Sequence, residues 1–142
     1  MSLSAGNRSS LLGACPLFRG VGSEGLAALS SVATEVSFTA GHVIARQGEI
    51  GTGFFVIVEG TVRVVRDGDV VAHLGQGDFF GELSVLDGRP RNAMVTTETP
   101  TTCIAIATWD FESALLANPV VTLAILRGVA ARLRDATDAS RH

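Results

Sequence analysis

The residues best suited to bind a ligand are concentrated in one segment, residues 80–93, here called the cassette. Glu82 can only accept hydrogen bonds when it is ionised, which suits a sugar hydroxyl and not a phosphate. Arg91 carries a planar guanidinium that makes charge-assisted, often bidentate contacts with phosphate oxygens. Gly81 has no side chain to keep a bound group away from the backbone. The cassette therefore suits a small phosphate ester that carries a sugar hydroxyl.

The order of residues within the cassette is also informative. Residues 80–84 read Phe-Gly-Glu-Leu-Ser, and residues 90–93 read Pro-Arg-Asn-Ala. This pattern resembles the phosphate-binding cassette of the cyclic nucleotide-binding domain family, which includes cyclic-AMP receptor transcription factors, protein kinase regulatory subunits and nucleotide-gated channels. The resemblance covers most of the chain, from about Leu17 to Ala136. It includes the upstream residues 41–44, 47–49, 57–62 and 75–78.

The resemblance implies a role for each matching residue. Glu82 would hold the ribose 2′-hydroxyl, and Arg91 would hold the cyclic phosphate. Asn92 would contact the phosphate or the base, and Thr137 falls where a helix residue of the family contacts the purine. The other matching residues would supply backbone donors or cavity wall. The expected ligand-binding residues are Phe80, Gly81, Glu82, Leu83, Ser84, Arg91, Asn92, Ala93 and Thr137.

Composition limits the class of protein. A chain of 142 residues is the size of one domain with a single core. Although 46% of the residues are apolar, no stretch approaches the roughly 20 apolar residues of a membrane span. The net charge is −3 and there is no lysine, which argues against a direct grip on a nucleic-acid backbone. We expect a soluble, cytoplasmic domain with no membrane span.

Catalytic and metal-binding patterns are weak. Cys15 and Cys103 lack the paired spacing of a zinc site, so we expect buried free thiols. Alternation places His73 on the exposed face of a strand, opposite Val70. Ser84 has no neighbouring histidine to activate it. We therefore predict no enzyme, no metal site and no cofactor other than the nucleotide ligand.

Periodicity divides the chain into one disordered lead-in, residues 1–10, and one domain, residues 11–138. Residues 11–33 have the spacing of N-terminal helices, with Ser23 as an expected cap. Residues 34–108 contain short β-branched and aromatic runs separated by glycines, which indicates an antiparallel β-roll or jelly-roll barrel. The expected strands are residues 36–38, 43–45, 54–58, 61–65, 70–74, 93–96 and 102–106.

Asp67-Gly68 between two of these strands predicts a hairpin. The cassette interrupts the strands, so we expect a short helix there. Two helices are expected over residues 109–138, the first capped by Thr108 and the second by Asn118 before Pro119. The predicted fold is α+β but mainly β: a β-roll with an N-terminal helix, a cassette helix and two C-terminal helices.

The last helix, expected over residues 120–137, carries two apolar stripes. One stripe contains Val121, Ile125 and Val129; the other contains Leu123, Leu126, Ala130 and Leu133. Two stripes are more than one core face needs. Either both pack on the β-roll, or one meets the same helix of a second subunit, as in the bacterial receptor dimers that this helix resembles. Arg132 lies on the side of the helix that could face the cavity.

The leading hypothesis is a regulatory sensor that binds a cyclic nucleotide and signals through movement of the last helix, drawn over the base as a lid. Cyclic AMP is preferred over cyclic GMP, although Asn92 matches neither purine preference cleanly. The effector is expected outside residues 1–142. The alternative is a protein-interaction or dimerisation module that retains the fold without the nucleotide.

Overall fold

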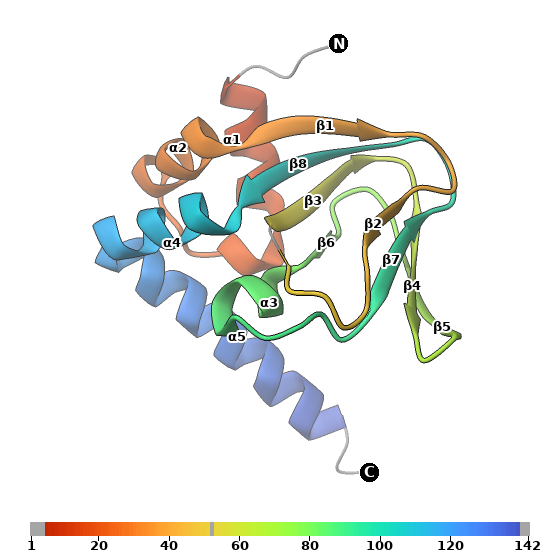
Figure 1. Cartoon of the computed structure of the whole chain (residues 1–142). Helices are drawn as coiled ribbons and strands as arrows, with labels where there is room; N and C mark the ends of the chain where they lie inside the picture. Colours follow the sequence, from red (N-terminus) through yellow and green to blue (C-terminus); the bar gives the residue numbers. More distant parts are fainter. Residues whose placement is uncertain (1–4, 52, 140–142) are drawn as a thin grey trace.

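The structure is a computed structural model that describes residues 5–51 and 53–139. Helices from both ends of the chain gather on one side of a β-roll, and the last helix runs past it (Figure 1). This confirms the predicted α+β fold built on a β-roll, although more residues lie in helices than in strands, so the fold is not mainly β. In chain order the elements are α1 (Ala5–Ala14), η1 (Pro16–Phe18), α2 (Ser23–Val32), β1 (Thr34–Phe38), β2 (Val43–Ala45), β3 (Gly53–Glu59), β4 (Val62–Arg66), β5 (Asp69–Leu74), β6 (Phe79–Phe80), α3 (Glu82–Asp87), β7 (Met94–Thr97), β8 (Thr101–Ala107), α4 (Thr108–Ala117) and α5 (Pro119–Ala139).

The strands form two antiparallel four-stranded sheets, ordered β1-β8-β3-β6 and β2-β7-β4-β5. The expected strands are confirmed with shifts of one or two residues at their ends. Strand β6 was not predicted, because two residues are too few to show alternation. It pairs with β3 through Phe55↔Phe80 and Val56↔Phe79, so the sheet delivers the chain directly into α3.

Two apolar clusters hold these layers together. The larger lies between the helices and the first sheet. There the Phe18 ring lies edge to face with Phe54, with 5.4 Å between ring centroids, and tilted against Phe111, with 6.2 Å between ring centroids. The smaller lies inside the roll and includes Cys103. Both cysteines are buried and free, as predicted, and burial raises the pKa of Cys15 to about 11 and of Cys103 to about 12. Both thiols therefore stay protonated at neutral pH.

The β4–β5 hairpin turns at Asp67-Gly68, as predicted, with positive φ at both residues (53° and 85°). A bulge between Val64 and Val65 shifts the register, so that Val65 pairs with Val70 while Arg63 pairs with His73. Because cross-strand partners share a face, Val70 lies on the same outer face as His73. The prediction that they lie on opposite faces is wrong, because strict alternation does not allow for the extra residue.

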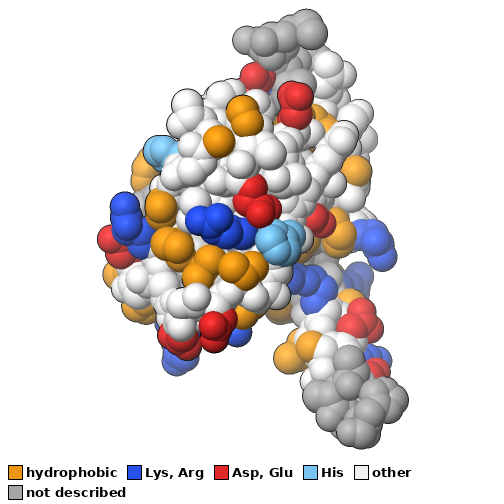
Figure 2. Space-filling view, turned by 90° about the vertical axis from the view of Figure 1, so that its right-hand side faces the viewer, with side chains coloured by type: hydrophobic (Ala, Val, Ile, Leu, Met, Phe, Trp, Pro, Cys, Tyr) orange, Lys and Arg blue, Asp and Glu red, His pale blue; other side chains and the backbone are white. Residues whose placement is uncertain are grey.

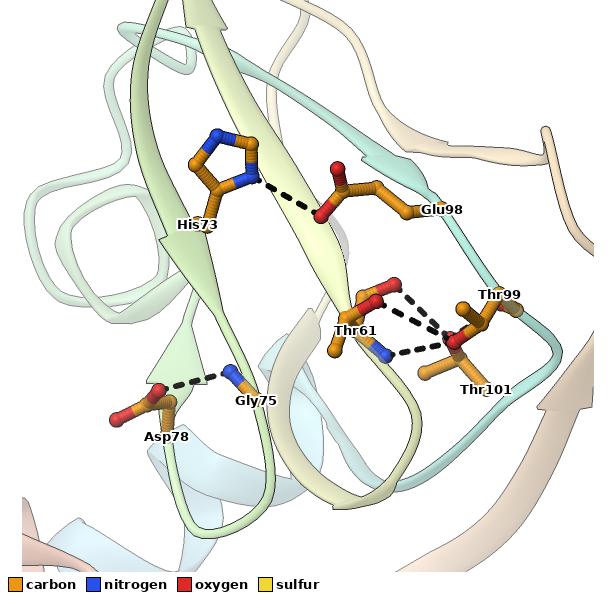
Figure 3. A network of polar contacts seen from close by, with 7 residues as sticks. All are labelled: Thr61, His73, Gly75, Asp78, Glu98, Thr99 and Thr101. Carbon is orange, nitrogen blue, oxygen red and sulfur yellow. Dashed lines mark hydrogen bonds and ion pairs between the residues drawn. The ribbon is translucent and has the colours of Figure 1, made fainter.

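Polar contacts close the turns at one end of the roll (Figure 3). His73 Nδ1 lies 3.1 Å from Glu98 Oε1, in an exposed pair. Thr61 donates its backbone N–H to the Thr99 hydroxyl (3.0 Å). Asp78 accepts the backbone N–H of Gly75 (2.8 Å), which fixes the turn that leads from β5 into β6 and the cassette.

The helix ends differ from the predictions. Residues 5–10, expected in a disordered lead-in, form the first part of α1, which continues to the buried residue Leu12. Residues 1–4 lie outside the described residues. Neither Ser23 nor Thr108 is a cap, since each is the first residue of its helix. The Thr108 hydroxyl instead donates to Gly51 O (3.3 Å). Asn118 caps α5 as predicted, with its side-chain oxygen accepting the N–H of Val121 (3.2 Å).

Helix α5 buries one of its two stripes. Val121 and Ile125 are 2% exposed and pack in the larger core cluster. In the other stripe Leu126 and Leu133 are 62% and 67% exposed. Of the two alternatives, packing of both stripes on the β-roll is therefore not found in this chain, and pairing of one stripe with a second subunit stays a prediction.

Positive and negative side chains are interspersed on the face over β4 and β5 (Figure 2). Val70 and Val71, both in β5, are also exposed. Within residues 5–51 and 53–139, no single helix has the length and apolar character of a membrane span; only α4 and α5 taken together, bent by 114°, meet that test.

Candidate ligand-binding site

A cavity of about 280 Å³ opens beside α3. Its walls come from β4, β6, α3, β7 and the loop between α3 and β7. Every cassette residue predicted to bind ligand lines it, so the structure brings that set together. The lining residues of the predicted set are Phe80, Gly81, Glu82, Leu83, Ser84, Arg91, Asn92 and Ala93.

Gly81 makes the junction between β6 and α3 possible. Its φ is +92°, in the left-handed region that residues with a side chain rarely adopt. A Cβ at this position would lie 2.6 Å from Gly53 O and 2.9 Å from Nη1 of Arg91. The chain therefore turns here against both the β3 backbone and the guanidinium, and it places Glu82 as the first residue of α3.

Ser84 holds α3 against the loop before β3. Its hydroxyl is buried, accepts the N–H of Gly51 (3.0 Å) and donates to Arg89 O (2.5 Å). The resemblance implied only a backbone donor or a wall for this residue. The side chain therefore also has a structural role, which nothing in the sequence indicated because Gly51 lies 33 residues away.

Arg91 is fixed through both its backbone and its side chain. Its N–H donates to Glu49 O (2.7 Å), and its carbonyl accepts the N–H of Gly48 (2.9 Å). Its guanidinium Nη2 donates to Gly53 O (2.9 Å) and packs against Gly51, where a Cβ would lie 2.7 Å from Cζ. A guanidinium has five N–H donors, so the bond to Gly53 leaves several for a phosphate.

Burial lowers the pKa of Arg91, and the Glu82 carboxylate opposes this effect by raising it. A guanidinium stays protonated in proteins, so the physical consequence is a partly desolvated cation beside a buried carboxylate. A desolvated charge gains more from an anionic partner than a fully hydrated one does. Arg91 and Glu82 therefore give the cavity a partly desolvated cation and a buried hydrogen-bond acceptor, the pair that a phosphorylated sugar requires.

Glu82 already has a partner from α5. Its Oε1 accepts a hydrogen bond from Nη1 of Arg132 (3.3 Å), and the Arg132 guanidinium lies over the Phe79 ring, 4.7 Å from its centroid. The prediction that Arg132 faces the cavity side is thus confirmed.

An apolar wall faces these charged groups, and sequence reasoning did not identify it. It includes Val64 of β4 and Val95 of β7, which are cross-strand partners, together with Phe79. The two valines share a face because they are partners in the regular β4–β7 pairing, which depends on a strand about 30 residues away in the sequence. Asn92 also has an unpredicted contact, because its carbonyl accepts a bond from Arg66 Nε (3.2 Å).

Thr137 does not reach the cavity. It is exposed on the second half of α5, where its hydroxyl donates to Leu133 O (2.9 Å). It lies five residues beyond Arg132, about 7.5 Å further along the helix axis at ~1.5 Å per residue. Its predicted contact with a purine therefore requires α5 to move, and it stays a prediction. Within the described part of the chain, no group of three or more His, Cys, Asp or Glu side chains could hold a metal ion.

The chain is similar to known proteins over most of its length, including the cassette. Residues 35–118 match the family described as "Cyclic nucleotide-binding domain". A cyclic nucleotide-gated potassium channel of Rhizobium etli is 36% identical over 111 residues, which cover 78% of this chain and 31% of the channel. A CRP-like cAMP-activated global transcriptional regulator of Mycobacterium tuberculosis is 32% identical, covering 87% of this chain and 58% of the regulator. The chain thus spans about a third to somewhat over half of these relatives.

Solved structures agree with this match. The N-terminal domain of a transcriptional regulator from Streptomyces coelicolor superposes with a TM-score of 0.81 and is 34% identical. The match covers 93% of this chain and 96% of that domain, so the likeness extends over most of the fold and is not limited to the cassette.

Proposed function

Because the chain belongs to the cyclic nucleotide-binding domain family, we propose that the cassette cavity binds a purine 3′,5′-cyclic nucleotide, with cyclic AMP preferred over cyclic GMP. Domains of this family are typically regulatory modules and not catalysts. The single observation that carries the proposal is the placing of Glu82 and Arg91 on one cavity of about 280 Å³, near the lower end of the usual range for small-molecule sites.

Each group of the ligand has a matching group in the cavity. Arg91 donates to the cyclic phosphate through the guanidinium N–H groups that are not bonded to Gly53 O. Glu82 accepts a hydrogen bond from the ribose 2′-hydroxyl. The apolar wall of Val64 and Val95 packs against the flat face of the base. The preference for cyclic AMP is supported by the likeness to a regulator described as cAMP-activated.

Calorimetric titration of the purified chain with cyclic AMP and with cyclic GMP tests this proposal. We expect saturable binding of both, tighter for cyclic AMP, and loss of that binding in Arg91→Ala. Arg127→Ala is a matched control, because it removes the same charge from an exposed position on α5 that does not line the cavity. Absence of heat and of thermal stabilisation at millimolar nucleotide would refute the proposal.

Signalling is proposed to occur through movement of α5. A ligand shifts such an equilibrium only by its differential affinity for the two states, and a preference of ~100-fold supplies roughly 2.7 kcal/mol. The effector lies outside residues 1–142. The relatives attach their matching segments to a channel and to a transcriptional regulator, so the comparison favours no single effector.

A dimerisation module is the second candidate, and the exposed stripe of α5 favours it. Leu123, Leu126 and Leu133 are 45%, 62% and 67% exposed, and with Ala130 they follow the alternating steps of three and four residues of a coiled-coil seam. Pairing of this stripe with a second copy would bury it. Sedimentation analysis tests this: we expect a dimer that Leu126→Glu dissociates, and a monomer at high micromolar concentration would contradict pairing.

A further inference from the structure

The tip of the β4–β5 hairpin is held by a side chain from a different turn. Within residues 5–51 and 53–139, Asp67 is the single non-glycine residue with positive φ. Gln47, in the turn between β2 and β3, makes two hydrogen bonds with it. Gln47 Nε2 donates to Asp67 Oδ1 (2.7 Å), and Gln47 Oε1 accepts the Asp67 backbone N–H (2.9 Å). This two-bond contact, here called the clamp, fastens the hairpin tip to the β2–β3 turn.

The two segments that the clamp joins also bond to the end of the cassette. From the β2–β3 turn, Gly48 donates its N–H to Arg91 O (2.9 Å), and Glu49 O accepts the Arg91 N–H (2.7 Å). From the hairpin, Arg66 Nε donates to Asn92 O (3.2 Å). The backbone of residues 91 and 92 therefore lies between the turn and the hairpin, and the clamp closes the ring of contacts.

The place of the Arg91 guanidinium follows from the place of this backbone. The guanidinium bonds to Gly53 O (2.9 Å) and packs against Gly51, so the side chain is confined at its far end as well. Gln47 is exposed and does not line the cavity. Any effect of Gln47 on a ligand in the cavity must therefore pass through the backbone of the cassette.

We propose that Gln47 is a positioning residue for the nucleotide phosphate. Through the clamp it holds the hairpin tip and the β2–β3 turn in one arrangement, and that arrangement sets the direction from which Arg91 meets the phosphate. The inference rests on the proposed function, in which Arg91 binds the cyclic phosphate. A bidentate contact depends on the orientation of the guanidinium plane, so a small shift of the supporting backbone weakens it.

Calorimetric titration of Gln47→Ala with cyclic AMP tests the proposal. This variant loses both hydrogen bonds without a change of charge, and we expect the affinity to fall by about three- to tenfold. Gln76→Ala is the matched control, because Gln76 is exposed in the turn between β5 and β6 and does not line the cavity. We expect its affinity to stay within about twofold of wild type. A general loss of stability leaves the affinity unchanged while nearly all of the protein is folded, and urea unfolding of the same samples checks that condition.

A charge exchange across the clamp supplies a rescue. Gln47→Glu replaces the amide donor by an oxygen that faces the Asp67 carboxylate, so it should also weaken binding. Adding Asp67→Asn restores a donor, now on the hairpin side, and Asn tolerates a positive φ. We expect the double variant to recover an affinity within about twofold of wild type. A double variant that binds no better than Gln47→Glu would contradict the positioning role.

Hydrogen exchange of the Arg91 and Gly48 N–H groups gives a readout that needs no ligand. Both should exchange faster in Gln47→Ala than in wild type, whereas the Gly77 N–H, which donates to Ile57 O (2.8 Å), should not change. Wild-type binding that Gln47→Ala leaves unchanged would overturn the positioning role while the proposed function stands. Absence of cyclic AMP binding in wild type would refute the proposed function and the phosphate role together. Equal exchange of the Arg91 and Gly48 N–H groups in the two proteins would refute the clamp on its own.

Discussion

Replacement of Gly81 by alanine separates the effect of backbone conformation from that of close packing in the cassette. The new Cβ would meet Gly53 O at 2.6 Å and Arg91 Nη1 at 2.9 Å, and Gly53 O is a backbone atom that cannot rotate away. The left-handed conformation costs about 1–2 kcal/mol for a residue with a side chain. Overpacking adds typically 1–3 kcal/mol, so the total loss of unfolding free energy is roughly 2–5 kcal/mol.

Gly77→Ala is a matched control for this experiment. Its φ of +88° is almost the same as that of Gly81, but nothing lies within 4 Å of the position its Cβ would take. Effects of the substitution on the unfolded chain are shared and cancel in the comparison. Urea unfolding should therefore show a larger loss for Gly81→Ala, by about 1–3 kcal/mol, and calorimetry should show lost cyclic AMP affinity for Gly81→Ala alone. Equal stability losses in the two variants would refute the packing argument.

Two further predictions follow from buried groups. Ser84→Ala should cost about 1–3 kcal/mol of unfolding free energy in urea, because it leaves Gly51 N–H without its acceptor, whereas Ser113→Ala on the exposed side of α4 should cost under about 0.5 kcal/mol. Burial raises the pKa of Cys103 to about 12, so the unfolded chain loses this proton first and stability should fall by up to ~1.4 kcal/mol per pH unit above about pH 9. Unfolding midpoints of wild type and Cys103→Ala between pH 8 and about 10.5 check this, with a shallower slope expected for the variant.

Local patterns in the sequence predicted the elements that depend on neighbouring residues. The hairpin at Asp67-Gly68, the cap at Asn118 and most of the strands follow from nearby residue types, and the structure confirms them. The first part of α1, residues 5–10, was missed because these residues are small or polar and show no apolar periodicity, while the buried Leu12 lies beyond them. The prediction of the face on which Val70 lies was wrong, because a bulge depends on the register with the partner strand.

Within the candidate site, the cassette residues could be identified because their order in the chain is itself the signal. Their partners could not. Ser84 bonds to Gly51 and Glu82 bonds to Arg132, across 33 and 50 residues of sequence. Such contacts depend on how the elements pack, and single-residue chemistry does not specify which of several arginines reaches a given carboxylate.

The same long-range contacts determine how substitutions in the site must be interpreted. Arg91 holds Gly53 O as well as the proposed phosphate position, so Arg91→Ala removes a structural bond together with a ligand contact. A loss of binding would then have two explanations, and the unfolding free energy measured on the same sample separates them. A variant that keeps its stability has lost the phosphate contact, whereas one that loses several kcal/mol has lost the arrangement of β3 and the cassette on which every ligand contact depends.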